Sequence, residues 1–399
     1  MAGQPSFDRM WSELAPIGRS AATGGYRRFA WTATDHELRE WFAAQAVGRG
    51  LTLMLDRGGN QWAWWGEPSS GHRGVAIGSH LDSVPDGGAF DGPLGVVTSF
   101  AVVDALRERG FEPARPIGIV NFGDEEGARF GIACAGSRLI TGALAADRAL
   151  ALSDAEGTSM AQAMRAGGFD PARLGADRKL LDLLGCFVEL HVEQGRGLID
   201  LDQPVAVGSQ IWPHGRWRIE LPGEANHAGT TRLADRRDPM LACAQLILAA
   251  RAAAERRDSV ATMGKVSVVP NGVNAIASQV TVWLDARGTD PGQVLATVAE
   301  LEALASAAGG SMLRESWTEA TPFDPGLTAR VRSVLPDAPV LSTGAGHDAG
   351  ILANADVASA MLFVRNPTGV SHSPAEFAER DDCHAGVAAL TEVVAELAG

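Results

Sequence analysis

Short apolar runs that end in polar residues, separated by stretches with helical spacing, constrain this fold more than any other feature. Three such runs cover residues 75–80, 117–122 and 187–191, and residues 93–106 between the first two have helical spacing. Strands that alternate with helices indicate βαβ units on a mostly parallel sheet flanked by helices. Ligands bind such sheets beyond the carboxyl ends of the strands, so the polar residues that follow these runs are the first candidates for chemistry.

The middle of the chain follows a different order of elements. Four strand patterns and two helical stretches cover 217–221, 239–256, 261–269, 276–284, 291–307 and 311–317. The order β-α-β-β-α-β is the split βαβ arrangement of ferredoxin-like sandwiches. It predicts a smaller α+β domain in this part of the chain.

The α/β pattern then resumes with an expected strand at 360–364 and a closing helix to Leu397. We therefore predict a larger α/β domain formed by residues 1–208 and 324–399. The α+β domain, residues 209–323, is expected as an insertion into it.

We expect a helix in the N-terminal part of the chain, and we expect no secretion signal there. Thr34 and Glu37 form a capping-box pattern for an amphipathic run to Ala46, although Thr32 leaves the start of this helix open. Residues 1–8 lack a basic stretch followed by an apolar one.

Composition argues against several classes of protein. The 399 residues carry 34 Lys and Arg against 48 Asp and Glu, a formal net charge of −14, which argues against nonspecific nucleic-acid binding. No uncharged apolar run is long enough to predict a membrane span. The four cysteines lie far apart without a C-x-x-C motif, which favours reduced thiols. We expect a cytoplasmic protein that binds neither nucleic acid nor a membrane.

The first polar cluster has the composition of a metal site. Residues 78–92 read GSHLDSVPDGGAFDG and contain His80, Asp82 and Asp91. An imidazole suits a transition metal, and Asp82 can accept the other ring N–H of His80. The glycine-rich turn lets Asp91 fold back toward the same point. A surface turn with incidental acids is the alternative.

Other strand ends carry side chains of the same kind, each weak alone. Glu125 and Glu126 follow the run at 117–122, where buried carboxylates are costly unless a cation compensates them. Adjacent residues point opposite ways, so one carboxylate can bind metal while the other faces a substrate. His191 and His372 follow other apolar runs. A solvated helix start for the acids and structural roles for the histidines are the alternatives.

Together these positions predict a centre for two divalent metal ions about 3.5–4 Å apart. The predicted ligands are His80, Asp91, Glu126, His191 and His372. We expect zinc first, and manganese, cobalt or nickel also tolerate such a set.

Seven motifs extend this pattern over nearly the whole chain. They are GSHLD (78–82), GGAFDG (87–92), EEGARF (125–130), ELHVEQG (189–195), GEANHAGTT (223–231), GAGHDA (344–349) and SHSP (371–374). In kind and order they resemble the amidase branch of the dinuclear zinc aminoacylase/carboxypeptidase family. That branch includes N-carbamoyl-L-amino-acid hydrolases, β-ureidopropionases and allantoate amidohydrolases.

The resemblance implies roles for the ligand-type residues. Asp91 would bridge two metals, with His80 and His191 on one and Glu126 and His372 on the other. Glu125 would be the general base, with Asp82 beside it in the catalytic set. The inserted domain would be a lid that forms a homodimer.

The resemblance also implies contacts with a substrate. The implied positions are Gln194, His227, Asn274, Arg287 and Gly346. Arg287 can clamp a carboxylate, Asn274 offers a neutral donor, and His227 can donate to a developing oxyanion. A surface or dimer salt bridge is the alternative for Arg287. His347 and Asp348 are either a binding pair or a structural helix start.

These features predict a metal-dependent hydrolase that cleaves a linear C–N bond in a small anionic ureido or acylamino compound, first an N-carbamoyl-L-amino acid. Allantoate, β-ureidopropionate and N-formyl or N-acyl amino acids are the alternatives. A peptidase is less favoured, because His191 stands where peptidase relatives usually carry an acid. A non-catalytic binding protein is less favoured, because Glu125 accompanies a full ligand set. Departures from the family pattern at Arg196, Arg232 and Leu233 weaken the transfer of substrate identity more than that of chemistry.

Overall fold

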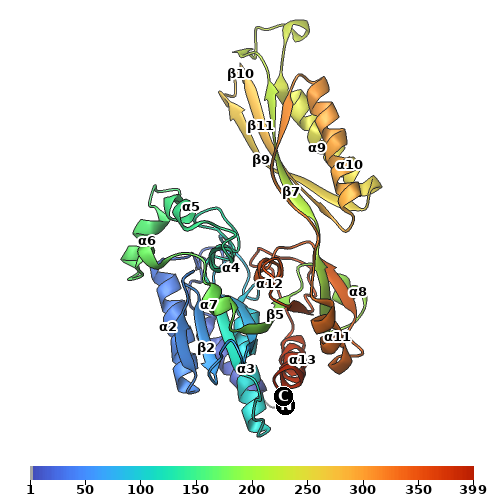
Figure 1. Cartoon of the computed structure of the whole chain (residues 1–399). Coiled ribbons are helices and arrows are strands. Elements are labelled where there is room, and N and C mark those ends of the chain that lie inside the picture. Colours follow the sequence, from blue (N-terminus) through green and yellow to red (C-terminus); the bar gives the residue numbers. More distant parts are fainter. Residues whose placement is uncertain (1–2) are drawn as a thin grey trace. The chain divides into compact units, whose positions relative to one another are not determined.

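The structure, a computed structural model, describes residues 3–399, which divide into two compact units. Unit 1 consists of the chain up to Ser209 together with Pro322–Gly399, and unit 2 consists of Gln210–Thr321. Unit 2 is therefore inserted into unit 1, and the colours of Figure 1 follow the chain through this insertion.

A nine-stranded sheet forms the centre of unit 1, with the order β1-β2-β4-β3-β5-β15-β6-β13 and with β14 beside β6. Its strands are β1 (Thr52–Leu55), β2 (Gln61–Trp65), β3 (Gly74–His80), β4 (Ile117–Phe122), β5 (Leu184–Val192), β6 (Val205–Ile211), β13 (Thr321–Pro322), β14 (Val340–Thr343) and β15 (Ser359–Val364). The central strands β4, β3, β5 and β15 are parallel, and antiparallel pairs flank them. This confirms the predicted mixed sheet with a parallel centre.

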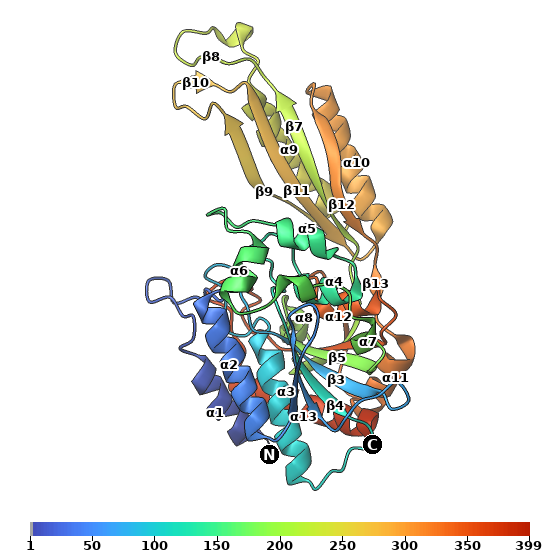
Figure 2. The same cartoon turned by 60° about the vertical axis from the view of Figure 1, so that its left-hand side comes forward.

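Long helices supply most of the apolar surface that packs on this sheet. They are α1 (Gln4–Leu14), α2 (Ala33–Gly48), α3 (Pro93–Glu108), α11 (Pro325–Val334) and α13 (Arg380–Ala398). Figure 2 shows α1, α2, α3 and α13 beside the sheet. One apolar core joins side chains of these helices to side chains of β3, β5 and β15. The core fixes the parallel strands, and with them the positions of their carboxyl ends.

Six short helices complete unit 1. They are α4 (Ala135–Thr141), α5 (Ala146–Ala151), α6 (Met160–Ala166), α7 (Arg178–Leu181), α8 (Gly197–Asp200) and α12 (Asp348–Ala353). Side chains of α4, α5 and α6 form a second, smaller apolar cluster.

Helix α2 begins earlier than the capping-box pattern at Thr34 and Glu37 predicts. Its N-cap is Thr32, whose hydroxyl accepts a hydrogen bond from the backbone N–H of Asp35 at 3.3 Å. The carboxylate of Asp35 in turn accepts the backbone N–H of Trp31 at 2.9 Å. The predicted box at Thr34 was therefore wrong, because the pair that satisfies the free N–H groups lies two residues earlier.

Unit 2 is a four-stranded antiparallel sheet with the order β12-β7-β11-β9 and two long helices. Its elements are β7 (His214–Pro222), β8 (Asn226–His227), α9 (Pro239–Arg256), β9 (Ser259–Val269), β10 (Ala275–Ile276), β11 (Gln279–Gly288), α10 (Pro291–Ala307) and β12 (Ser311–Thr318). Both helices start at Asp-Pro, where Asp238 and Asp290 cap the free N–H groups. The order of elements and strands is that of a ferredoxin-like sandwich.

The predicted strand at 276–284 is two strands. The backbone N–H of Ser278 donates to the carbonyl of Val269 at 2.8 Å, and the chain bends there. The preceding residues form β10, which pairs with β8 in a separate two-stranded ribbon, and the following ones form β11.

No helix in residues 3–399 combines the length and the apolar character needed to cross a bilayer.

Candidate metal centre

The carboxyl ends of the parallel strands place the ligand-type side chains at one edge of the unit 1 sheet. His80 is the last residue of β3, and His191 is the penultimate residue of β5. Glu125 and Glu126 follow β4, and His372 lies in the loop after β15. Asp91 comes from the loop between β3 and α3 and reaches the same place.

Asp91 belongs to two groups of ligand atoms. Atoms of His80, Asp91 and His191 lie within 4.8 Å of one another, as do atoms of Asp91, Glu126 and His372. Its Oδ1 is 3.1 Å from Nε2 of His191, and its Oδ2 is 3.3 Å from Nε2 of His372. The two carboxylate oxygens of Asp91 therefore face different groups, as a bridging ligand requires. We call these sets the first group (His80, Asp91, His191) and the second group (Asp91, Glu126, His372).

The chemistry of both groups fits divalent cations. Nε2 of His80 and Oε1 of Glu126 are buried and have no hydrogen-bond partner within residues 3–399. Buried polar atoms normally have partners, so these two atoms are available to a ligand. Imidazole and carboxylate donors suit zinc, manganese, cobalt and nickel.

The electrostatics indicate that protons compensate the acids when no metal is bound. Burial and the charge of Asp91 raise the pKa of Glu126 to about 7. The hydrogen bond to Asp91 raises the pKa of His372 to about 9. Burial opposes ionisation of Asp91, but hydrogen bonds from His191 and His372 hold its pKa well below the usual range. The centre thus keeps an anionic Asp91 beside a cationic His372, which is the charge arrangement that a metal ion would replace.

Asp82 organises two parts of the centre. Its Oδ1 lies 3.4 Å from Nδ1 of His80, as the sequence suggests. Its two carboxylate oxygens also accept the backbone N–H groups of Glu125 at 3.1 Å and Glu126 at 3.0 Å. Asp82 therefore holds the turn that carries both glutamates, a role that the local sequence gives no sign of.

Glu125 lies beside the ligand groups and is a member of neither. Its Oε2 is 3.7 Å from Nε2 of His80, and its Oε1 accepts a hydrogen bond from Sγ of Cys134 at 3.1 Å. Burial raises its pKa well above the usual range. A carboxylate with a raised pKa next to a metal centre is suited to accept and return a proton.

Two of the predicted substrate positions lie in unit 1. Nε2 of Gln194 donates to Oδ2 of Asp91 at 3.0 Å and to Oγ of Ser371 at 2.9 Å, so this residue is part of the centre. Gly346 precedes His347, whose buried ring lies 4.5 Å from the ring of His191. Gly346 is thus one residue from a side chain that packs against the first group.

The other three predicted substrate positions lie in unit 2, at opposite ends of its sheet. His227 in β8 pairs with Ala275 in β10, and the backbone N–H of Ala228 donates to the carbonyl of Asn274 at 2.9 Å. Arg287 instead pairs with His214, the first residue of the nine-residue strand β7. At about 3.3 Å per residue, β7 separates the two positions by roughly 30 Å. The structure brings His227 and Asn274 together, and it does not bring Arg287 to them.

The ring of His227 is held by its own loop. The backbone N–H of Gly229 donates to Nδ1 of His227 at 2.9 Å, so the neutral ring carries its proton on Nε2. The guanidinium of Arg236 donates to the carbonyls of Ala228 at 2.6 Å and Thr231 at 3.1 Å, which lie on either side of Gly229.

Arg287 makes an ion pair within its own strand. Its Nε lies 2.6 Å from Oδ1 of Asp285, and its Nη2 lies 2.9 Å from Oδ2. This geometry matches the salt-bridge alternative, and a substrate carboxylate would have to compete with Asp285.

Among the residues at the centre that sequence reasoning missed are Cys134 and Glu376. Cys134 donates to Glu125, and Glu376 accepts the backbone N–H of Asp91 at 2.9 Å. The only signal for Glu376 is its place four residues after His372 in the same loop, and nothing near Cys134 in the sequence marks its contact.

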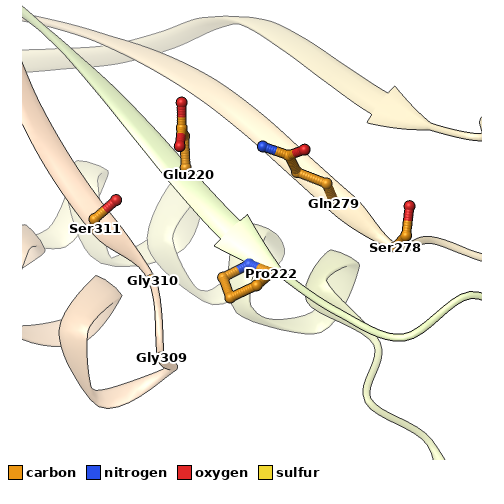
Figure 3. Close-up of a pocket in the computed structure, with 7 residues that line it drawn as sticks. All are labelled: Glu220, Pro222, Ser278, Gln279, Gly309, Gly310 and Ser311. Carbon is orange, nitrogen blue, oxygen red and sulfur yellow. The ribbon is translucent and has the colours of Figure 1, made fainter.

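An open hollow on unit 2 is separate from these residues (Figure 3). It lies at the end of β7 and the starts of β11 and β12 and is lined by Glu220, Pro222, Ser278, Gln279, Gly309, Gly310 and Ser311. It contains no predicted site residue, and Glu220 is its one ionisable side chain.

Comparison with known proteins decides the family. The model of Peptidase family M20/M25/M40 matches residues 76–396. The chain belongs to this family. An N-carbamoyl-L-amino acid amidohydrolase of Geobacillus stearothermophilus is 36% identical over 408 residues, which cover 98% of each chain. An allantoate amidohydrolase of Escherichia coli is 31% identical over 401 residues, which cover 96% of each chain.

Comparison with solved structures supports the same family assignment. The crystal structure of a hydantoinase/carbamoylase family amidase from Burkholderia ambifaria has a TM-score of 0.83 at 32% identity, covering 99% of this chain and 98% of that one. The chain is thus a metal-dependent amidohydrolase of the M20 family, which acts on C–N bonds other than peptide bonds.

Proposed function

We propose that this protein hydrolyses the ureido C–N bond of an N-carbamoyl-L-amino acid to give the amino acid, ammonia and carbon dioxide. The observation that carries the proposal is one carboxylate, Asp91, shared by two ligand groups with a protonatable Glu125 beside them. The carbamoyl-amino-acid hydrolase at 36% identity favours this substrate over allantoate, whose hydrolase is 31% identical. Allantoate, β-ureidopropionate and N-formyl or N-acyl amino acids are alternatives within the same chemistry.

The first group would hold one divalent ion and the second group the other, with zinc as the first expectation. Bound there, such ions supply Lewis-acid activation of water and of the substrate carbonyl. Glu125 takes the proton of the attacking water and returns it to the leaving nitrogen, and its raised pKa suits both steps. Asp82 keeps Glu125 in place through the backbone of the turn.

Five further residues would bind the substrate. His227 donates its Nε2–H to the oxyanion that develops on the carbonyl, and Asn274 and Arg287 bind the substrate carboxylate. Gln194 and Gly346 contact the substrate from unit 1.

The separation within unit 2 supports a homodimer. A small substrate cannot touch His227 and Arg287 of the same subunit, because these residues lie roughly 30 Å apart along β7. We therefore assign His227 and Asn274 to one subunit of a composite site and Arg287 to the other.

One surface of unit 2 would suit a second copy of the chain. Strand β9 has 11 residues and is the last strand on its side of the sheet, so one of its backbone edges is unpaired within the described residues 3–399. Beside it in the chain, α9 exposes Leu241 by 67% and Leu248 by 73%. A long unpaired edge next to exposed leucines is a liability unless a partner covers both. We expect light scattering to report a dimer, and Leu248→Arg to shift it toward monomer.

The substrate proposal is tested by a product-release assay with added zinc or manganese. N-carbamoyl-L-amino acids, allantoate, β-ureidopropionate and N-formyl-L-glutamate are offered, and ammonia, formate and free amine are measured. Ammonia with free amino acid from the carbamoyl substrates is the expected result. Faster turnover of another substrate would reassign the specificity, and no release from any of them would contradict the proposed chemistry.

Glu125→Gln tests the role of the base. Loss of a general base typically costs 10²–10⁴-fold, so we expect kcat to fall by about that factor. Metal content should stay at the wild-type level, because Glu125 belongs to neither ligand group. A Gln variant with wild-type kcat would contradict the assignment.

We also place the protein in a reducing compartment such as the cytoplasm. The support is chemical: Cys134, Cys186, Cys243 and Cys383 are all buried free thiols in the structure.

A further inference from the structure

Glu376 is a buried carboxylate that links two distant loops of unit 1. It is 4% exposed and lies in the loop after β15, four residues past His372. Its Oε1 accepts the backbone N–H groups of Phe90 and Asp91, each at 2.9 Å. Glu376 and Asp91 are 285 residues apart in the chain. One oxygen atom therefore joins the loop that carries Asp91 to the loop that carries His372.

The surroundings of Glu376 keep this link tight. Oγ of Ser371 lies 3.3 Å from Oδ2 of Asp91 and 3.5 Å from Oε2 of Glu376. A Cβ atom on Gly88 would lie only 2.3 Å from Oε1 of Glu376, so the loop before Asp91 is packed directly against the carboxylate. The loop has no room to shift toward Glu376.

Aromatic side chains pack beside the same point. The ring of Phe90 packs against Trp11 of α1 at 4.8 Å and against Phe377 at 5.9 Å between centroids. Phe377 follows Glu376, so the two loops meet through side chains as well as through the hydrogen bonds. A second buried carboxylate so near Asp91 is electrostatically costly, and a structural need of this kind explains why it is there.

The two ligand groups differ in how much they depend on such a link. His80 and His191 of the first group lie on the buried strands β3 and β5. His372 of the second group is on a loop, its side chain is 49% exposed, and its φ is +56°. The position of His372 relative to Asp91 is therefore set by the loops and by what joins them.

We propose that Glu376 is a positioning residue that assembles the second group by tying the Asp91 loop to the His372 loop. This inference rests on the metal centre of the proposed function. It predicts that Glu376 acts through its acceptor oxygen, without binding metal or substrate, and that its loss weakens the second metal position more than the first.

The test is a Zn²⁺ titration of the metal-free full-length protein against a chromophoric chelator, which needs no substrate. Removing a residue that orients metal ligands typically costs 10–100-fold in affinity, so Glu376→Ala should weaken the second ion by about that factor. Glu376→Gln retains an acceptor oxygen and should bind both ions within about threefold of wild type. His372→Ala gives the reference for a lost second position, and Glu392→Gln, at an exposed residue paired with Arg109, is the matched control.

If Glu376→Ala does not fold, Glu376→Asp replaces it in the titration. It keeps the charge and withdraws the oxygen from the two N–H groups, so the second ion should again weaken while the first stays. Two ions bound at wild-type affinity by the Ala or Asp variant, or equal weakening of both ions, would overturn the role of Glu376 alone. A wild-type protein that binds fewer than two ions would overturn the metal centre and this inference together.

Discussion

At the scale of single residues, the protons of the metal-free centre determine how metal binding depends on pH. The pKa of His372 is raised to about 9 and that of Glu126 to about 7, and both groups must lose their protons to bind metal. Each displaced proton makes affinity rise about 10-fold per pH unit below the pKa of the group concerned. We expect zinc affinity to rise with pH between 7 and 9, and more steeply below 7. Chelator competition across this range measures the slope, and an affinity that does not change with pH would contradict the prediction.

Substitution of Arg236 tests the proposed donor role of His227. Its guanidinium holds the carbonyls on either side of Gly229, and Gly229 directs the ring proton of His227 to Nε2. Displacing a catalytic donor by about 1 Å costs up to about 10²-fold, so we expect Arg236→Ala to lower kcat 10- to 100-fold.

The tautomer itself is measured by ¹⁵N NMR of labelled histidine, assigned with a His227→Gln variant. A pyridine-like Nδ1 and a protonated Nε2 are expected in the wild type. Arg232→Ala is the matched control, because Arg232 is exposed and pairs with Asp235 in the same loop. Protonation of Nδ1 in the neutral wild-type ring would exclude the proposed geometry.

At the scale of elements, the junction between the Asp91 loop and α3 depends on a glycine. Gly92 is the N-cap of α3 with φ +84°, and a Cβ there would lie 2.4 Å from Cε1 of His80. Gly92→Ala should displace His80, weaken the first metal ion and lower the free energy of unfolding by about 1–3 kcal/mol.

Thermal unfolding and zinc titration measure these two effects. Gly110→Ala is the matched control, because Gly110 has φ +67° but no atom within 4 Å of the added Cβ. It shares the backbone strain without the clash, so it should lose stability and keep its zinc affinity. Equal zinc affinities in the two variants would show that the contact with His80 is unimportant.

The strands of the parallel centre could be predicted because each is a buried apolar run that is followed by polar residues. Strands β3, β4, β5 and β15 and helices α3, α9, α10 and α13 lie where periodicity and Asp-Pro starts place them. Strands β1, β2, β6 and β14 were not predicted, and β1, β6 and β14 lack a clear alternation. The bend at Ser278 was missed because a tertiary hydrogen bond to Val269 causes it.

The residues of the candidate site could likewise be predicted only in part. His80, Asp91, Glu126, His191 and His372 occur at motif positions, so their proximity could be anticipated from the carboxyl ends of parallel strands. The contacts of Glu376 and Cys134 could not, because they join segments through loop geometry that has no local pattern. Asp82 could be predicted in part. Its contact with His80 is local in the sequence, but its hydrogen bond to the backbone of Glu125 joins distant segments.

At the scale of the whole molecule, the roughly 30 Å between His227 and Arg287 predicts complementation between inactive subunits. His227→Ala and Arg287→Ala should each be inactive as homodimers. In a random mixture half of the dimers are mixed, and each mixed dimer has one intact site, so about a quarter of wild-type activity should return.

Co-expression with two affinity tags followed by assay of the doubly tagged dimers measures this recovery; because all of these dimers are mixed, they should show about half of the wild-type activity. The matched control is a mixture of His227→Ala and Asn274→Ala, because these residues lie side by side in one subunit, so each site of a mixed dimer would lack one of them. The composite site would be excluded if activity also returned in the control mixture. It would equally be excluded if no activity returned in the mixture of His227→Ala and Arg287→Ala.

The insertion of unit 2 also orders the events of synthesis. Strand β15 lies between β5 and β6 in the sheet, yet it leaves the ribosome only after all of unit 2 has been made. Unit 2 is contiguous and can close its own sheet first, whereas unit 1 must keep two strand edges open until residues 322–399 arrive. Pairings between such distant segments form slowly. Because His372 and Glu376 arrive with the same segment, we expect the nascent chain to complete its second metal position only after all of unit 2 has been made.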